Sequence, residues 1–325
     1  MKDARVPPPP MSVASPAGVR RQVPGLGRLT AAWNSFFHQP EPVIGIAFFR
    51  ILWGLALLLN WVLLGPDVLT WFGERGVLSS ETARWLIGSG RLNLLAILPR
   101  SDAWAITLFS ATALASVSLT VGFMTRASAL VVFLGLVSMH HRNILILNSG
   151  DTLLRVVTFL LIFSPAGEAL SVDRWRRARR GQAGEEPPWR SPWVQRLIQI
   201  QVAVLYLSAF LWKMQGAMWL DGTAVYYMSR LVEFQRFSLP FWFAHLWAVK
   251  VMTWGSLFVE FGLGVLVWIR PLRYPLLIAG ALLHLGVEYT MNIPVFQWLM
   301  IISLTIFIEP AHLAAAAGRL RGRPL

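Results

Sequence analysis

The chain has 325 residues, of which 55% are hydrophobic and only 14% are charged. Charged residues make up about 25% of ordinary soluble domains, so this composition excludes that class and predicts a protein that crosses a membrane several times. The net charge is +13, but the basic residues form short clusters between apolar runs, which favours the loops of a membrane protein over nucleic-acid binding. The absence of cysteine excludes disulfides, iron–sulfur clusters and thiol chemistry.

Residues 1–42 are rich in proline and arginine and have no apolar stretch of signal-peptide length, which predicts a disordered cytoplasmic tail with a short interfacial helix at Ala31–His38. About twenty apolar residues span a bilayer as a helix. We predict an all-α membrane bundle of about eight such helices over residues 43–309, followed by a basic cytoplasmic tail at residues 310–325. Some segments are short, so the number of spans is open by one or two. The predicted spans, in chain order, are Val43–Leu64, Ala103–Met124, Ala127–Leu147, Thr152–Phe163, Trp193–Met214, Ala244–Ile269, Tyr274–Tyr289 and Pro294–Ile308.

The distribution of basic residues predicts the orientation of these spans. With both termini in the cytoplasm, most Lys and Arg residues outside the spans lie on the inner side, as the positive-inside rule requires. The chain is therefore expected in the inner cell membrane as a multi-pass protein. Its outer loops contain Gly, Asp, Asn and aromatic residues, so we expect a functional site to open outward.

Several ionisable residues lie within or beside the predicted spans. Each costs about 2.5–3.5 kcal/mol at the bilayer centre on insertion scales, so such groups usually face a partner or a cavity. Arg50 can extend to the cytoplasmic headgroups or pair with Glu260 on another helix. Asp151 and Arg155 are four residues apart, which predicts either a structural ion pair or a clamp for an anion on one helical face.

Three of the six histidines, His140, His141 and His284, lie within the predicted spans Ala127–Leu147 and Tyr274–Tyr289. His284 is expected to be a hydrogen-bonded packing residue, and His140 and His141 to lie at the membrane interface. A metal site formed by these histidines with Glu288 is conceivable, but no spacing typical of metal ligands supports it, and we predict no metal.

The most informative stretch is FLWKMQGAMWLDGTAVYY, at Phe210–Tyr227. Lys213 stands near the outer end of its predicted span, where it can extend toward the membrane surface. Alternatively, Trp212, Met214 and Trp219 would keep water from the amine, and removal from water favours a neutral amine that can act as a base.

Five stretches occur together in one order: FRILWGLALL, GERGVLSSE, HHRNILILNSGDTLLR, SVDRW and YLSAFLWKMQGAMWLDGTAVYYMS. Between about Val43 and Glu309 they resemble the bacterial HTTM family, whose transmembrane domain is shared with vitamin K-dependent gamma-carboxylase. The resemblance implies an eight-helix bundle with its site toward the outer side. It also implies that Lys213 takes the position of the carboxylase's proposed base, which deprotonates reduced vitamin K, and that His284 and Phe296 match the seventh helix and the segment after it.

The sequence departs from the carboxylase in two respects. Residues 148–151 read Asn-Ser-Gly-Asp where the carboxylase branch has an Asn-Asn-His run, so the corresponding histidine is absent. The large lumenal region that helps the carboxylase bind its protein substrate is also absent. Gamma-carboxylation of glutamate is therefore not expected.

Two functions remain open, and neither involves nucleic acid. An enzyme would bind a reduced isoprenoid quinone or a lipid-like molecule in an outward-facing pocket, with Lys213 as the base. A noncatalytic factor in the lipid bilayer would assist the maturation or export of a secreted peptide or protein partner, as a second branch of the family does. A transporter is less favoured because the two halves show no internal repeat. The expected site comprises Lys213 and His284 in catalytic roles, supported by Asn148, Asp151, Arg155, Trp212, Trp219, Asp221, Tyr226, Glu260 and Phe296.

Overall fold

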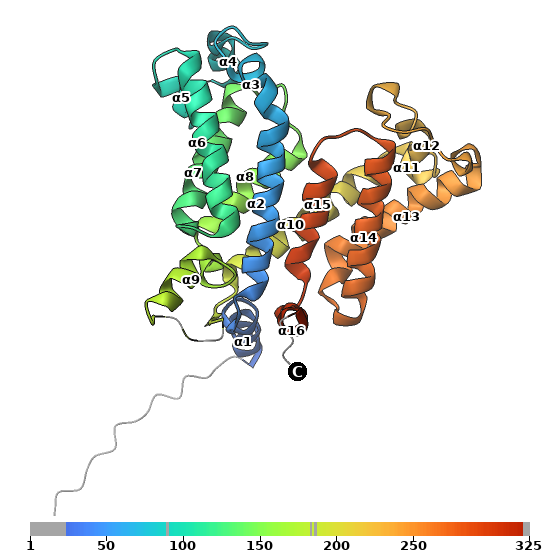
Figure 1. The fold of residues 1–325 in the computed structure, drawn as a ribbon. Helices are drawn as coiled ribbons and strands as arrows, with labels where there is room; N and C mark the ends of the chain where they lie inside the picture. The colour runs from blue at the N-terminus through green and yellow to red at the C-terminus, as the bar shows by residue number, and fades with distance from the viewer. Residues whose placement is uncertain (1–23, 89–90, 183, 185–186, 321–325) are drawn as a thin grey trace, which may run out of the picture.

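The computed structural model describes residues 24–88, 91–182, 184 and 187–320 (Figure 1). Over these residues the fold is a helical bundle, which confirms the all-α prediction. Its small antiparallel sheet pairs β1 (Glu41–Pro42) with β2 (Trp189–Arg190). The predicted disordered tail falls largely on residues outside the described ranges.

Each predicted span corresponds to a helix. Among the described residues, four helices are long and apolar enough to cross a membrane, or five if a pair bent by 99° between Phe307 and Pro310 forms one span. The other predicted spans carry polar or basic residues or are short, so the count of eight and the cytoplasmic position of both termini stay predictions. The helices are α2 (Ile44–Leu64), α6 (Asp102–Val121), α7 (Thr125–Arg142), α8 (Ser149–Ile162), α10 (Trp193–Lys213), α13 (Leu246–Val265), α14 (Arg270–Thr290) and α15 (Phe296–Leu304).

Short helices lie at the two ends of the bundle (Figure 1). The helix predicted at Ala31–His38 is present, although it begins earlier than expected, at Pro24; its interfacial position stays a prediction. The lower end in Figure 1 holds α1 (Pro24–His38), α9 (Val172–Arg179) and α16 (Pro310–Leu320), and the upper end holds α3 (Val68–Phe72), α4 (Ser80–Ile87), α5 (Leu94–Ile97), α11 (Ala217–Leu220) and α12 (Ala224–Met228). Single 3-10 turns occur at Gly65–Asp67, Ala166–Glu168, Val232–Phe234, Phe241–Ala244, Leu266–Trp268 and Thr305–Phe307.

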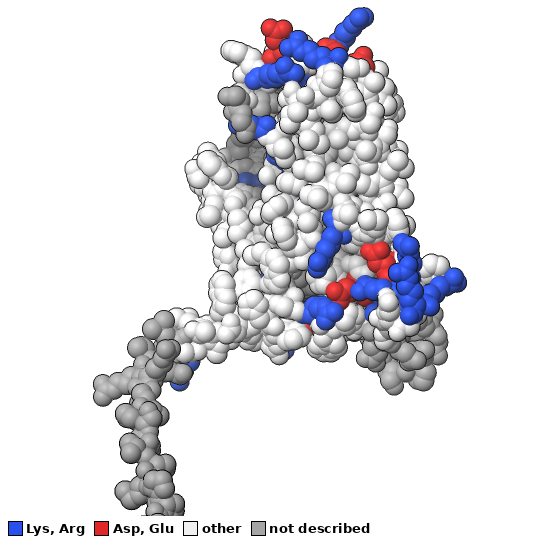
Figure 2. Space-filling view, turned by 90° about the vertical axis from the view of Figure 1, so that its left-hand side faces the viewer, with Lys and Arg blue, Asp and Glu red and all other residues white. Residues whose placement is uncertain are grey.

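On one face of the molecule, the charged residues lie away from the middle. Figure 2 shows Lys, Arg, Asp and Glu concentrated toward the two ends of one face, with a broad uncharged band between them. Such a band is expected where a protein contacts hydrocarbon, because a charge at that depth is costly. The surface therefore agrees with a membrane protein.

Helix α2 forms the centre of the core. Trp53 and Trp61 are 0% and 2% exposed, and they pack in the main cluster of buried apolar side chains. Each indole N–H donates to a neighbouring helix: Trp53 to the Thr158 hydroxyl at 3.1 Å and Trp61 to the Ser116 hydroxyl at 3.0 Å. Buried indoles are stable when their N–H finds such a partner.

Arg50 on α2 differs from both sequence expectations. It is completely buried, and its guanidinium donates to the carbonyls of Ala166 at 2.9 Å and Leu170 at 2.6 Å. It therefore neither extends to the headgroups nor pairs with Glu260. Carbonyls in the turns that follow α8 give the guanidinium acceptors that a carboxylate would otherwise provide.

The contact between α2 and α6 depends on Gly54. A Cβ added there would lie 2.2 Å from the Thr120 hydroxyl oxygen and 2.9 Å from its Cα, so the two helices would have to separate. We expect Gly54→Ala to lower the free energy of unfolding by about 1–3 kcal/mol, the usual range for overpacking. Unfolding in mixed detergent micelles measures this change. The matched control is Gly255→Ala on α13, where an added Cβ meets nothing within 4 Å; equal losses in the two variants would contradict the packing argument.

Candidate functional site

Lys213, the last residue of α10, has partners within the protein. Its ammonium forms an ion pair with Glu260 on α13 and lies 4.5 Å from the centre of the Trp219 ring. The Lys213 side chain is 26% exposed and that of Glu260 is 9% exposed. A carboxylate on one side and an aromatic face on the other both stabilise the cation, so this lysine is positioned by the fold.

A second set of hydrogen bonds lies beside this pair. Tyr206, on α10 two turns before Lys213, is joined through its hydroxyl to Nε2 of His284 at 2.8 Å. Nδ1 of His284 is 2.7 Å from Oε1 of Gln297, at the start of α15. An amide oxygen only accepts, so Nδ1 donates to Gln297 and Nε2 accepts from the Tyr206 hydroxyl.

Together, Lys213, Glu260, Tyr206, His284 and Gln297 form the Lys213 cluster. Its members come from α10, α13, α14 and α15, and the charges of Glu260 and Lys213 act electrostatically on Tyr206 and His284 respectively. The cluster thus brings together both predicted catalytic residues and one predicted supporting residue, Glu260.

One atom of the cluster lacks a partner. Oε2 of Glu260 is buried and has no hydrogen-bond partner among the described residues. Buried acceptors are nearly always satisfied, so an exception indicates a place for a missing donor. A hydroxyl group of a bound molecule would supply that donor.

A family model of the HTTM domain matches residues 38–312. The chain belongs to the HTTM family. This confirms the family membership predicted from the sequence motifs, and the Lys213 cluster lies within the matched region. Comparisons with curated proteins and with solved structures give no significant match.

Asn148 and Asp151, two of the predicted supporting residues, cap the start of helix α8. The Asn148 side chain accepts from the backbone N–H of Gly150, and the Asp151 carboxylate accepts from the backbone N–H of Asn148, both at 2.7 Å. The predicted Asp151–Arg155 ion pair is wrong: Arg155 donates to Thr152 at 3.3 Å, because the capping box directs the Asp151 carboxylate back to the helix start.

Phe296 lies between the residues that cap α8 and the Lys213 cluster. A Cβ added at Gly150 would be 3.0 Å from the Phe296 ring, and Gln297 of the Lys213 cluster is the next residue. The start of α15 therefore lies between the cap of α8 and the cluster. No hydrogen bond or ion pair joins Asp151 or Arg155 to Lys213 in the described part of the chain.

Four residues singled out from the sequence are exposed or have other partners. Trp212 is 74% exposed and does not shield Lys213, because neighbouring residues of a helix point in directions about 100° apart. Met214 is also exposed, at 39%, so Trp219 alone of the three expected neighbours covers the amine. Asp221 accepts from Thr223 in a turn. Tyr226 lies 3.7 Å from the guanidinium carbon of Arg230 and is likewise exposed.

The histidines do not form a metal site. His140 is buried within the protein, 3.6 Å from Asp151, and Nδ1 of His141 meets the Leu92 carbonyl at 2.7 Å; their position at the membrane interface stays a prediction. Glu288 pairs with Arg236. Within the described residues, no group of three or more His, Cys, Asp or Glu side chains is arranged to hold a metal ion.

Sequence reasoning missed Tyr206 and Gln297. Tyr206 could have been found from its spacing, because seven residues before Lys213 place it on the same face of α10. Gln297 follows Phe296 in the sequence, but only the packing of α14 against α15 shows that it meets His284. An outward-facing pocket around Lys213 stays a prediction, since the two cavities described below lie near the opposite end of α10.

A double-mutant cycle tests the Lys213–Glu260 pair. We expect Lys213→Met to lower the free energy of unfolding by about 2 kcal/mol, because it leaves the Glu260 carboxylate buried without its counter-charge; the usual cost of ~3–5 kcal/mol is reduced by the partial exposure of Lys213. The double variant Lys213→Met/Glu260→Leu should recover most of this loss. Lys250→Met is the control, because the Lys250 ammonium lies 5.7 Å from the Trp254 ring centre and forms no ion pair with a described residue. Strictly additive effects at Lys213 and Glu260 would refute the coupling.

Proposed function

We propose that this HTTM protein binds a reduced isoprenoid quinone, or a lipid-like molecule with a comparable ionisable hydroxyl, at the Lys213 cluster. The observation that carries the proposal is the buried, unpartnered Oε2 of Glu260 beside the Lys213 ammonium. A hydroxyl donor satisfies this oxygen, and the positive charge of Lys213 stabilises the oxyanion that remains after the hydroxyl loses its proton.

Lys213 is the candidate base, and its partner determines when it can act. An amine accepts a proton only in its neutral form, so the proton held by the Lys213–Glu260 pair must then reside on Glu260. The hydroxyl then turns from Oε2 of Glu260 to Nζ of Lys213 and transfers its proton there, which restores the ammonium opposite the developing negative charge. Glu260 thus controls the protonation state of the base.

His284 has a supporting role in this proposal. Both of its ring nitrogens are engaged, by Tyr206 and Gln297, so it is not free to accept a proton from a bound molecule. It instead orients the Tyr206 hydroxyl within the cluster. His284 is therefore a positioning residue unless the bound molecule displaces Tyr206.

The proposal places the protein in the inner cell membrane with the α1, α9 and α16 end in the cytoplasm. Helix α9 supports this orientation, because its last turn contains Arg176, Arg177 and Arg179. The Lys213 end of α10 then faces the outer side, and as many as eight helices span the bilayer.

The composition of co-purified lipid tests the proposal. We expect wild-type protein purified from native membranes to retain an isoprenoid quinone, detected by mass spectrometry of the extract. Lys213→Ala should lower this content by about tenfold, as the loss of a charge-assisted contact predicts. Lys250→Ala, which removes the other described lysine, should leave it unchanged. Absence of quinone from the wild-type extract, or equal content in the two variants, would overturn the proposal.

The alternative is a noncatalytic factor for maturation or export of a secreted peptide or protein. It is supported by apolar side chains exposed around α11 and α12, among them Tyr227 at 54% and Val232 at 78%. A photo-crosslinking residue at Val232 should then capture the secreted partner, whereas one at Leu114, 68% exposed on α6, should not. This role also predicts that Lys213→Arg, which keeps a cation opposite Glu260, preserves capture; loss of capture in that variant would argue for the enzyme.

A further inference from the structure

We infer that a cavity at the opposite end of the bundle from Lys213 binds a phosphate-bearing anion. The cavity has a volume of about 280 Å³ and lies where the first residues of α10, α14 and α16 meet the segment before α2. Its charged lining consists of Arg196, Arg270, Arg273, Glu41 and Glu309. Three guanidinium groups face two carboxylates, which leaves an excess positive charge.

Two of the arginines are held in place by the protein. Arg196 pairs with Glu41 and donates to the Gln199 side chain at 3.0 Å and to the Phe36 carbonyl at 3.1 Å. Arg273 donates to Glu309 at 2.8 Å through Nη1, and its Nη2 has no hydrogen bond to a described residue. These contacts give the cavity a rigid wall.

Arg270 is the unpaired charge of the cavity. It is exposed, and it forms no ion pair or hydrogen bond with any described residue. Because Arg270 and Arg273 are one helical turn apart, both can approach the same anion. A guanidinium binds phosphate through two parallel N–H groups, so this pair fits a phosphate better than a single-atom anion.

The backbone adds to this preference. Arg270 begins α14, and Ala311 follows Pro310 at the start of α16; Arg270 and Ala311 both line the cavity, whereas Pro310 has no backbone N–H to offer. The first N–H groups of a helix carry partial positive charge, which stabilises an anion close to them. The helix starts therefore support the guanidinium groups without being the basis of the site.

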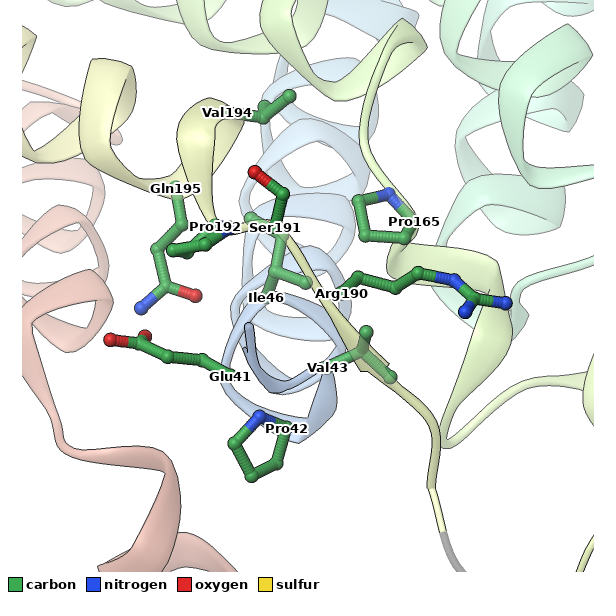
Figure 3. Close-up of a pocket in the computed structure, with 10 residues that line it drawn as sticks. All are labelled: Glu41, Pro42, Val43, Ile46, Pro165, Arg190, Ser191, Pro192, Val194 and Gln195. Atoms are coloured by element: carbon green, nitrogen blue, oxygen red, sulfur yellow. The ribbon is translucent and has the colours of Figure 1, made fainter. Parts of the chain in front are cut away.

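The larger cavity is the one with room for a phosphate group. Figure 3 shows a smaller adjoining pocket, in which Glu41 and Gln195 extend to one side while Arg190 points away. That pocket has about 10 Å³, which is room for about one water, so the larger cavity alone can hold a phosphate. Ile269 and Leu272 beside Arg270 are 46% and 40% exposed, which gives acyl chains an apolar surface next to the headgroup.

Native mass spectrometry of the full chain tests the site. The protein is presented with a mixture of phosphatidylglycerol and phosphatidylcholine, and we expect selective retention of the anionic lipid. Arg270→Gln should weaken that binding about tenfold, as expected for one charge-assisted contact. Arg126→Gln is the control, because Arg126 is exposed at the same end of the bundle, next to Thr125, which bonds to Asp173 of α9. Equal binding by the two variants would overturn the inference.

Two further measurements complete the test. Glu309→Gln removes a carboxylate from the cavity and should strengthen anion binding severalfold, a gain that misfolding would not produce; weaker binding would contradict the inference. Titration with glycerol 3-phosphate, followed by thermal unfolding, identifies the source of the phosphate. Stabilisation that Arg270→Gln abolishes supports a soluble phosphate ligand, whereas retention of the lipid alone supports a headgroup. Binding of neither would refute the site, and the result is independent of the quinone content at Lys213.

Discussion

Polar groups inside a bundle that excludes water have to find partners within the chain, and much of the architecture follows from this constraint. Arg50 shows it through two of its three guanidinium nitrogens: Nη1 and Nη2 join α2 to the turns that follow α8 through the carbonyls of Ala166 and Leu170, whereas Nε is buried without a hydrogen-bond partner among the described residues. Gly122 leaves room for it: an added Cβ would lie 2.3 Å from Nη1 of Arg50, and the φ of +72° also favours glycine. Loss of such a residue would disturb several helices at once.

The same constraint identifies the candidate site. Around Lys213 most polar atoms are satisfied: the ammonium meets Glu260, and His284 is held between Tyr206 and Gln297. Oε2 of Glu260 is the exception within this cluster. Other buried side-chain atoms also lack a hydrogen-bond partner, Oε2 of Glu288 among them, but Oε2 of Glu260 differs in lying on the carboxylate that pairs with Lys213. A bound hydroxyl would satisfy it.

Helix α10 connects this site with the cavity at the other end. Lys213 is its last residue, whereas Gln195 and Arg196 in its first turn line the cavity. A phosphate bound beside Arg270 would hold the starts of α10 and α14 together, and both helices also contribute to the Lys213 cluster. The two proposed sites therefore use residues of the same pair of helices, and each is tested separately.

The sequence by itself determined the helical class, the positions of the long helices and the HTTM membership, because apolar runs and short motifs are properties of neighbouring residues. It also pointed to Lys213 and His284. Only the tertiary structure decided their partners, since Lys213 and Glu260 are 47 residues apart and Tyr206 and His284 are 78 apart. Even within one helix, spacing does not decide which partner a side chain takes. Asp151 is four residues from Arg155, which allowed an ion pair, but its carboxylate caps the start of α8 beside His140. Partners across helices depend on how each helix is rotated in the bundle, and hydropathy alone does not specify that rotation.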